Sequence, residues 1–199
     1  MPQRKFGLIA VLVGLALAVI VACTAGGILA WHVLSQATAE PRPAPSTVQA
    51  VPDRCEYIAQ EGSRDVGMPS SAELLAPRTL RFTTNRGVIE VRADARRAPC
   101  TVNALAFLIG KGYFDGTSCH RLTTAGIFVL QCGDPEGTGR GGPTFQYADE
   151  NLPSGAFDGY PVGTVAMANA GPDTNGSQFF FVYGDGQLGP NYTIIGTLT

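Results

Sequence analysis

The chain has 199 residues and a formal net charge of −2, a length that suits one ordinary domain with an appendage. With 15% charged residues, 25 glycines and 14 prolines, it is too apolar for a disordered chain and too rich in turns for a helical bundle. Because it is mildly acidic and has no cluster of lysines and arginines, we expect no nucleic-acid partner.

A long apolar run follows a short basic start. Residues 6–34 contain no Asp, Glu, Lys or Arg, whereas residues 1–5 contain two basic side chains. About 20 helical residues span a bilayer, so we predict a transmembrane signal anchor over residues 6–34, with residues 1–5 in the cytoplasm. Two alternatives are a lipoprotein anchored at Cys23, because Ile20-Val21-Ala22-Cys23 resembles a lipobox, and a removed signal peptide. All three interpretations place the rest of the chain at the cell membrane or outside it, extracytoplasmic.

Residues 35–78 form the next segment and are rich in Pro and Ala. The run Pro41-Arg42-Pro43-Ala44-Pro45 favours extended, semi-rigid conformations. Such a sequence buries little apolar surface, so we predict a poorly ordered extracytoplasmic linker that holds the following domain off the membrane.

Residues 79–199 show the patterns of one mainly β domain. Alternating apolar residues predict a hairpin over residues 79–92. Apolar residues at helical spacing from Val102 to Ile109 predict an amphipathic helix that begins near Pro99. Further short strands are predicted at residues 118–122, 128–132, 164–167, 179–183 and 192–198. Many short strands with one early helix favour an antiparallel barrel or sandwich.

Four cysteines lie beyond the apolar run, at Cys55, Cys100, Cys119 and Cys132. An even number in an oxidising compartment suggests two disulfides. Cys119 and Cys132 flank a predicted hairpin, which favours a Cys119–Cys132 pair, and Cys55–Cys100 then follows by elimination. Three connectivities are possible, and four reduced, buried thiols are the alternative. No C-x-x-C spacing is present, so we predict no metal site.

Three segments of the domain carry its chemistry. They are Cys119-His120-Arg121 with Phe128–Asp134, Met167–Pro172, and Asn175–Phe180. Together with Tyr113-Phe114-Asp115-Gly116, they resemble the signature of the cyclophilin-type peptidyl-prolyl cis-trans isomerases over residues 79–199. The anchor and linker layout resembles the membrane-anchored cyclophilins of actinobacteria. The resemblance implies a cyclophilin-like antiparallel β-barrel that isomerises X–Pro bonds in exported polypeptides and assists their folding, without a cofactor.

The resemblance also implies roles for individual residues. The implied catalytic residues are Arg121, Phe128 and Gln131. The implied substrate-binding residues are Val129, Ala168, Asn169, Gln178, Phe180, Leu188 and Tyr192, the last at a position where most members have histidine. A guanidinium stays protonated, so Arg121 can donate to the prolyl nitrogen as the amide twists. A proline-peptide-binding or chaperone module without turnover is the alternative function.

The sequence departs from the family pattern in further places, one of which is Val129 at a position where methionine is common. The link Thr123–Ile127 is longer than usual, which would shift Arg121 relative to Phe128. Gln187 stands where cyclosporin-sensitive members carry tryptophan, so we expect weak cyclosporin binding. The sequence stops at Thr199, before the second helix and last strand of the family, so we expect the domain to be C-terminally incomplete.

Overall fold

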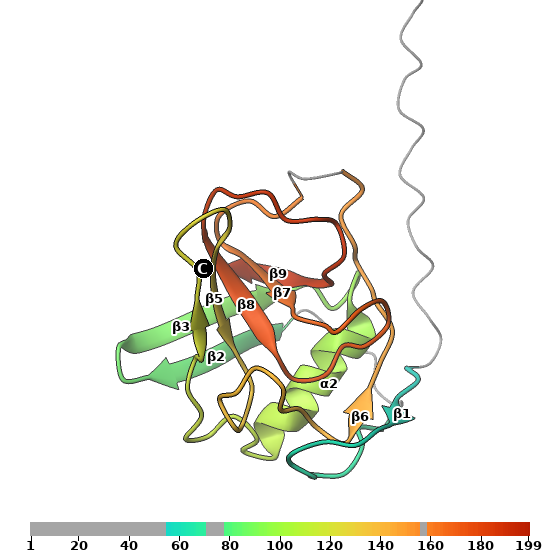
Figure 1. Cartoon of the computed structure of the whole chain (residues 1–199). Coiled ribbons are helices and arrows are strands. Elements are labelled where there is room, and N and C mark those ends of the chain that lie inside the picture. The colour runs from blue at the N-terminus through green and yellow to red at the C-terminus, as the bar shows by residue number, and fades with distance from the viewer. Residues whose placement is uncertain (1–54, 71–77, 156–158) are drawn as a thin grey trace, which may run out of the picture. The chain divides into compact units, whose positions relative to one another are not determined.

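The computed structural model describes residues 55–70, 78–155 and 159–199, and Figure 1 shows in them a curled sheet with one helix packed against it. No helix within these three ranges is both long enough and apolar enough to cross a membrane. The predicted anchor over residues 6–34 and the predicted linker up to residue 54 lie outside the described residues, so both stay predictions.

A seven-stranded antiparallel sheet forms the body of the domain, in the order β2-β3-β9-β7-β8-β5-β4. Its strands are β2 (Arg78–Thr84), β3 (Gly87–Ala93), β4 (Arg121–Leu122), β5 (Phe128–Cys132), β7 (Thr164–Met167), β8 (Phe179–Gly184) and β9 (Ile194–Leu198). The sheet curls but does not close, because the described residues supply no ladder between the outer strands β2 and β4. A closed barrel requires its first and last strands to pair, so the predicted antiparallel barrel is present in these residues as a mainly β half-barrel with one helix.

Most of the predicted elements are confirmed. The hairpin is β2 and β3, joined at Gly87, whose φ of 125° suits a residue without a Cβ. The helix is α2 (Pro99–Gly110), which begins with the proline at its first turn. The strand predicted from residue 118 is shorter and covers only β4. Two further strands, β1 (Ile58–Ala59) and β6 (Phe145–Gln146), were not predicted and pair with each other.

The main core lies between α2 and one face of the sheet. Val102, Leu105 and Leu108 of α2 are buried there, as their helical spacing predicts. Alternate residues of β8 meet them, because Phe179 and Phe181 point to this face of the sheet. The opposite face of the same strand is therefore left for other side chains, and Phe180 lies on it.

Residues 55–70, which we call the pre-domain segment, are folded against the domain. Tyr57 packs edge-on against the rings of Phe145 and Tyr147, with centroids 5.6 and 5.8 Å apart, and its hydroxyl donates to the Cys100 carbonyl at 2.9 Å. The Cys55–Cys100 disulfide ties the segment to the start of α2. Within the described residues, folded structure thus begins before residue 79. These contacts leave no periodic pattern in the segment itself, so no folded structure was predicted for it from the sequence.

A buried carboxylate from a distant loop caps the N-terminus of α2. Ala98 at the N-cap has no capping side chain. Glu150 accepts instead, from the Cys100 N–H at 3.1 Å, the Thr101 N–H at 2.8 Å and the Thr101 hydroxyl at 2.9 Å. Burial raises the pKa of Glu150, and the hydrogen bonds from Thr101 and Cys100 offset this rise only in part. The carboxylate joins the loop after β6 to the helix.

We predict that Glu150→Ala lowers the free energy of unfolding by about 3 kcal/mol, because it leaves buried N–H groups of α2 without acceptors. Because the pKa of Glu150 is raised in the fold, proton binding to this carboxyl favours the folded state. This proton-linked contribution to the free energy of unfolding is complete below the ordinary pKa of 4.5, and it is lost as the pH rises through the folded pKa. Urea unfolding between pH 4 and 7 measures both effects. Glu56→Ala removes an exposed carboxylate and serves as the control; equal stability of the two variants would contradict the capping role.

Candidate active site

The register of three neighbouring strands brings the predicted polar and aromatic site residues together. Gln131 on β5 pairs with Arg121 on β4 and, on its other side, with Phe180 on β8. Directly paired residues of antiparallel strands point to the same face of a sheet. Arg121, Gln131 and Phe180 therefore share the face that is turned away from α2.

A chain of hydrogen bonds fixes the polar side chains of this face. The Arg121 Nη1 donates to Gln131 Oε1 at 3.0 Å, and Gln131 Nε2 donates to Gln178 Oε1 at 2.8 Å. Gln178 Nε2 then donates to the Gly141 carbonyl at 2.9 Å. Each amide is thereby oriented at both ends. Arg121 keeps the rest of its donors for another acceptor, because a guanidinium has five N–H groups.

An apolar cluster lies beside this chain on the same face. Val129, Phe180 and Leu188 are buried in it, and Ala168 and Tyr192 pack against it. The rings of Phe180 and Tyr192 meet at right angles, with centroids 5.4 Å apart. The structure thus gathers five of the predicted substrate-binding residues, with a charged guanidinium at the edge of the sheet next to them.

Sequence reasoning missed Tyr160 in this cluster. Its hydroxyl donates to the Tyr192 carbonyl and accepts from the Tyr192 N–H, both at 2.9 Å. Burial raises the pKa of Tyr160 to about 12, so this hydroxyl stays protonated at neutral pH. No sequence signal marks Tyr160, because it lies in a loop without periodic pattern and 32 residues from its partner.

Phe128 lies outside the apolar cluster. The ladder between β5 and β8 shifts after Phe128, which pairs with Gly184, whereas Val129 pairs with Val182. The extra residue is Tyr183, and its exposed ring packs edge-on against Phe128 with centroids 5.9 Å apart. The bulge thus places the half-buried Phe128 ring at the surface, where its predicted catalytic role stays a prediction.

Asn169 offers its main chain rather than its side chain. The side-chain amide is held, because Nδ2 donates to the Asn191 carbonyl at 2.7 Å. Within the described residues, neither the N–H nor the carbonyl of Asn169 has a hydrogen-bond partner. The strand β7 ends two residues earlier, so the main chain of Asn169 lies beyond the ladder, where an extended peptide can pair with it.

The loop that accepts from Gln178 is organised by a buried aspartate. Asp134 Oδ1 accepts from the Glu136 N–H at 2.8 Å, while Oδ2 accepts from the Thr138 N–H at 2.8 Å and the Gly139 N–H at 2.6 Å. Burial alone would raise the pKa of Asp134, but these backbone hydrogen bonds outweigh it and lower the pKa. The ionised carboxylate thus shapes residues 134–141 and fixes the Gly141 carbonyl.

Both predicted disulfides are present. Cys119–Cys132 joins the residue two before Arg121 to the residue after Gln131, and so flanks the Arg121–Gln131 pair. Cys55–Cys100 lies in the pre-domain contact described above.

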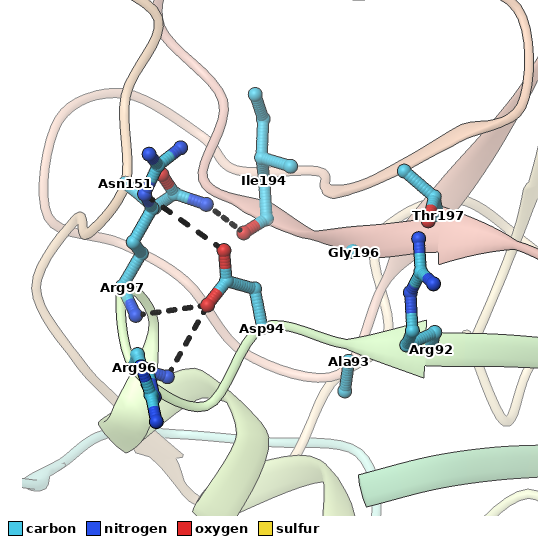
Figure 2. A pocket seen from close by; sticks show the side chains of 9 residues that line it. All are labelled: Arg92, Ala93, Asp94, Arg96, Arg97, Asn151, Ile194, Gly196 and Thr197. Atoms are coloured by element: carbon cyan, nitrogen blue, oxygen red, sulfur yellow. Dashed lines mark hydrogen bonds and ion pairs between the residues drawn. The ribbon is translucent and has the colours of Figure 1, made fainter. Parts of the chain in front are cut away.

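A separate cavity of about 360 Å³ lies beside β9, between that strand and the turn 94–97 (Figure 2). Asp94 is fixed there by the N–H groups of Arg96 and Arg97, at 3.3 and 3.2 Å. None of the predicted site residues lines this cavity. The candidate active site is therefore a different surface. It is the face of β4, β5 and β8 that is turned away from α2, together with the adjoining residues 168–192.

Comparison with known proteins gives a consistent match. The family described as "Cyclophilin type peptidyl-prolyl cis-trans isomerase/CLD" matches residues 79–199. A "Probable peptidyl-prolyl cis-trans isomerase B" of Mycobacterium leprae is 43% identical over 170 residues, which are 77% of this chain and 57% of the relative. Its namesake in Mycobacterium tuberculosis is 47% identical over 131 residues, 60% of this chain and 42% of the relative. The chain thus spans about half the length of these curated relatives.

Solved structures show the same likeness. A crystal structure of a cyclophilin type peptidyl-prolyl cis-trans isomerase of Cryptosporidium parvum has a TM-score of 0.55 and 32% identity, over 62% of this chain and 78% of that one. A second crystal structure of that protein, in the presence of the dipeptide Ala-Pro, has a TM-score of 0.54 and 31% identity, over 61% and 78% of the two chains.

We predict that the double substitution Cys119→Ser and Cys132→Ser lowers the free energy of unfolding by about 3 kcal/mol, because the bridge closes a loop between residues 13 apart. Denaturant unfolding measures this loss. Cys55→Ser with Cys100→Ser is the comparison: its bridge closes a loop between residues 45 apart, so its removal should lower the free energy of unfolding slightly more. A Cys119/Cys132 variant as stable as the wild type would contradict the prediction.

Proposed function

The chain belongs to the cyclophilin-type peptidyl-prolyl cis-trans isomerase family, and from this we propose that its domain accelerates X–Pro amide rotation in polypeptides. One observation carries the proposal: the Arg121 guanidinium is held by Gln131, one strand away from a cluster that includes Val129 and Phe180. A fixed cation beside an apolar surface suits a prolyl ring and its amide nitrogen.

The reaction is a rotation without bond cleavage. Resonance sets the barrier at about 18–20 kcal/mol, so catalysis requires weakening the double-bond character of the C–N bond. As the amide twists, the lone pair localises on the prolyl nitrogen and can accept from an N–H of Arg121. This hydrogen bond is stronger in the transition state than in the planar ground state, which is the condition for lowering the barrier.

Two features support a grip on the peptide around the proline. The free N–H and carbonyl of Asn169 can pair with the main chain of an extended substrate. The Gln131 and Gln178 amides, oriented by their mutual hydrogen bond, hold Arg121 in place while the substrate twists. The Cryptosporidium parvum relative solved in the presence of Ala-Pro supports recognition of proline peptides by this fold.

The proposal extends to the setting of the reaction. We infer that residues 6–34 anchor the chain in the cell membrane, with the domain extracytoplasmic, and that the clients are exported polypeptides whose folding it assists. The apolar run after a basic start and the two disulfides support this setting. Weak cyclosporin binding stays a prediction, since Gln187 is exposed and offers no indole donor or large apolar face.

We predict that Arg121→Ala lowers kcat/KM by about 100-fold, because it removes a donor used in the transition state. Arg121→Lys keeps the charge but loses the planar fork, so its activity falls between those of the wild type and Arg121→Ala. A protease-coupled assay with a proline peptide measures all three rates.

Arg86→Ala, at an exposed turn of the β2–β3 hairpin, is the control for this series. Equal isomerisation rates for Arg121→Ala and the wild type would contradict the proposed catalytic role of Arg121. Peptide binding that survives Arg121→Ala, with no turnover in any variant, would favour the binding-module alternative.

We predict that the full chain stays in the membrane fraction after an alkaline wash, whereas a chain without residues 1–34 is released, because those residues hold the apolar run. Cys23→Ala tests the lipoprotein alternative: loss of membrane retention in this variant would favour lipid attachment over a spanning helix. Release of the full chain by the wash alone would contradict both.

A further inference from the structure

A polar cavity of about 440 Å³ adjoins the proposed active site. Gln131 and Gln178 line it, so it opens from the hydrogen-bond chain that holds Arg121. The remaining lining comes from four places in the chain: residues 168–177 beyond β7, the loop residues 139–143, Gln146 of β6, and residues 60–62 of the pre-domain segment. A peptide bound across Asn169, which also lines the cavity, would present a neighbouring side chain to it.

The pre-domain wall of this cavity is held firmly on both sides of Glu61. Gln60 Nε2 donates to the carbonyls of Pro143 and Phe145, at 3.2 and 3.1 Å, and the Gln60 N–H donates to the Thr144 carbonyl at 3.0 Å. On the other side, Gly62 lies so close to Pro143 that a Cβ would collide with its carbonyl. The position of Glu61 is therefore set by its neighbours.

Glu61 itself is exposed and lines the cavity. Within the described residues its carboxylate has no hydrogen-bond or ion-pair partner. Arg140 of the loop also lines the cavity and forms no ion pair there with Glu61. The cavity thus has one acid and one base on different segments, neither neutralised by the other.

We propose that Glu61 makes this cavity a specificity subsite for a basic side chain that flanks the proline of the substrate. The inference rests on the proposed isomerase function. The carboxylate can accept from a lysine or arginine without losing an existing partner, and the fixed backbone around it limits the ordering that binding requires. Arg140, whose long side chain is exposed, favours an acidic substrate side chain. A variant of Arg140 is therefore the matched counterpart of a Glu61 variant.

The test uses the full chain in detergent and peptides that contain one Ala-Pro unit. A Lys, Gln or Glu is placed in turn at each of the three positions before the proline and the two after it. Exchange and titration measured by NMR give the catalysed rate and the Kd for each peptide. At one position we expect the Lys peptide to be preferred over the Glu peptide, and Glu61→Gln to reduce that ratio about three- to tenfold.

Arg140→Gln should shift the same ratio in the opposite direction, and Glu56→Gln, a nearby exposed carboxylate that does not line the cavity, should leave it unchanged. Both the preference and its loss should weaken at high salt. An unchanged Lys-to-Glu ratio in Glu61→Gln at every position would overturn the proposal. A ratio in Kd that depends on Glu61 while no peptide is isomerised would support the subsite and contradict the isomerase function instead.

Discussion

The pairing register of β5 is the constraint on which the rest of the site depends. It sets Gln131 opposite Arg121 on one side and Phe180 on the other, so that charge, amide and ring face the same way. A slip of one residue would turn every side chain of β5 to the other face. On the core side the partly buried Leu130 pairs with the buried Phe181 and opposes such a slip, so packing of the core also holds the site in register.

This arrangement divides one sheet between stability and recognition. The face that meets α2 buries the larger apolar cluster and closes the domain from that side. The other face carries the smaller cluster around Val129 and Phe180, beside polar groups that are already hydrogen-bonded to one another. A binding surface built on paired strands needs little rearrangement to accept a ligand, which suits a reaction that depends on holding a peptide in place.

The pre-domain segment extends the site beyond the sheet. It is tied to α2 by the Cys55–Cys100 disulfide, to β6 by the short strand β1, and to the loop 139–143 by the Gln60 amide. These contacts give a rigid wall to the cavity next to Gln178. The same segment leads toward the N-terminal part of the chain, so the residues that connect the domain to its predicted anchor also border the candidate active site.

The sequence by itself determined the hairpin, the helix from Pro99 and the central strands, because alternation and helical spacing are local properties. Motif order likewise named most of the residues of the candidate site. The tertiary structure decided what depends on distant partners. The bulge that moves Phe128 out of the apolar cluster depends on Tyr183. The position of Tyr160 depends on its hydrogen bonds to the Tyr192 main chain. The pre-domain segment is held by packing of Tyr57 on rings far along the chain. Closure of the sheet likewise depends on which strands pair, and no local sequence pattern encodes that pairing.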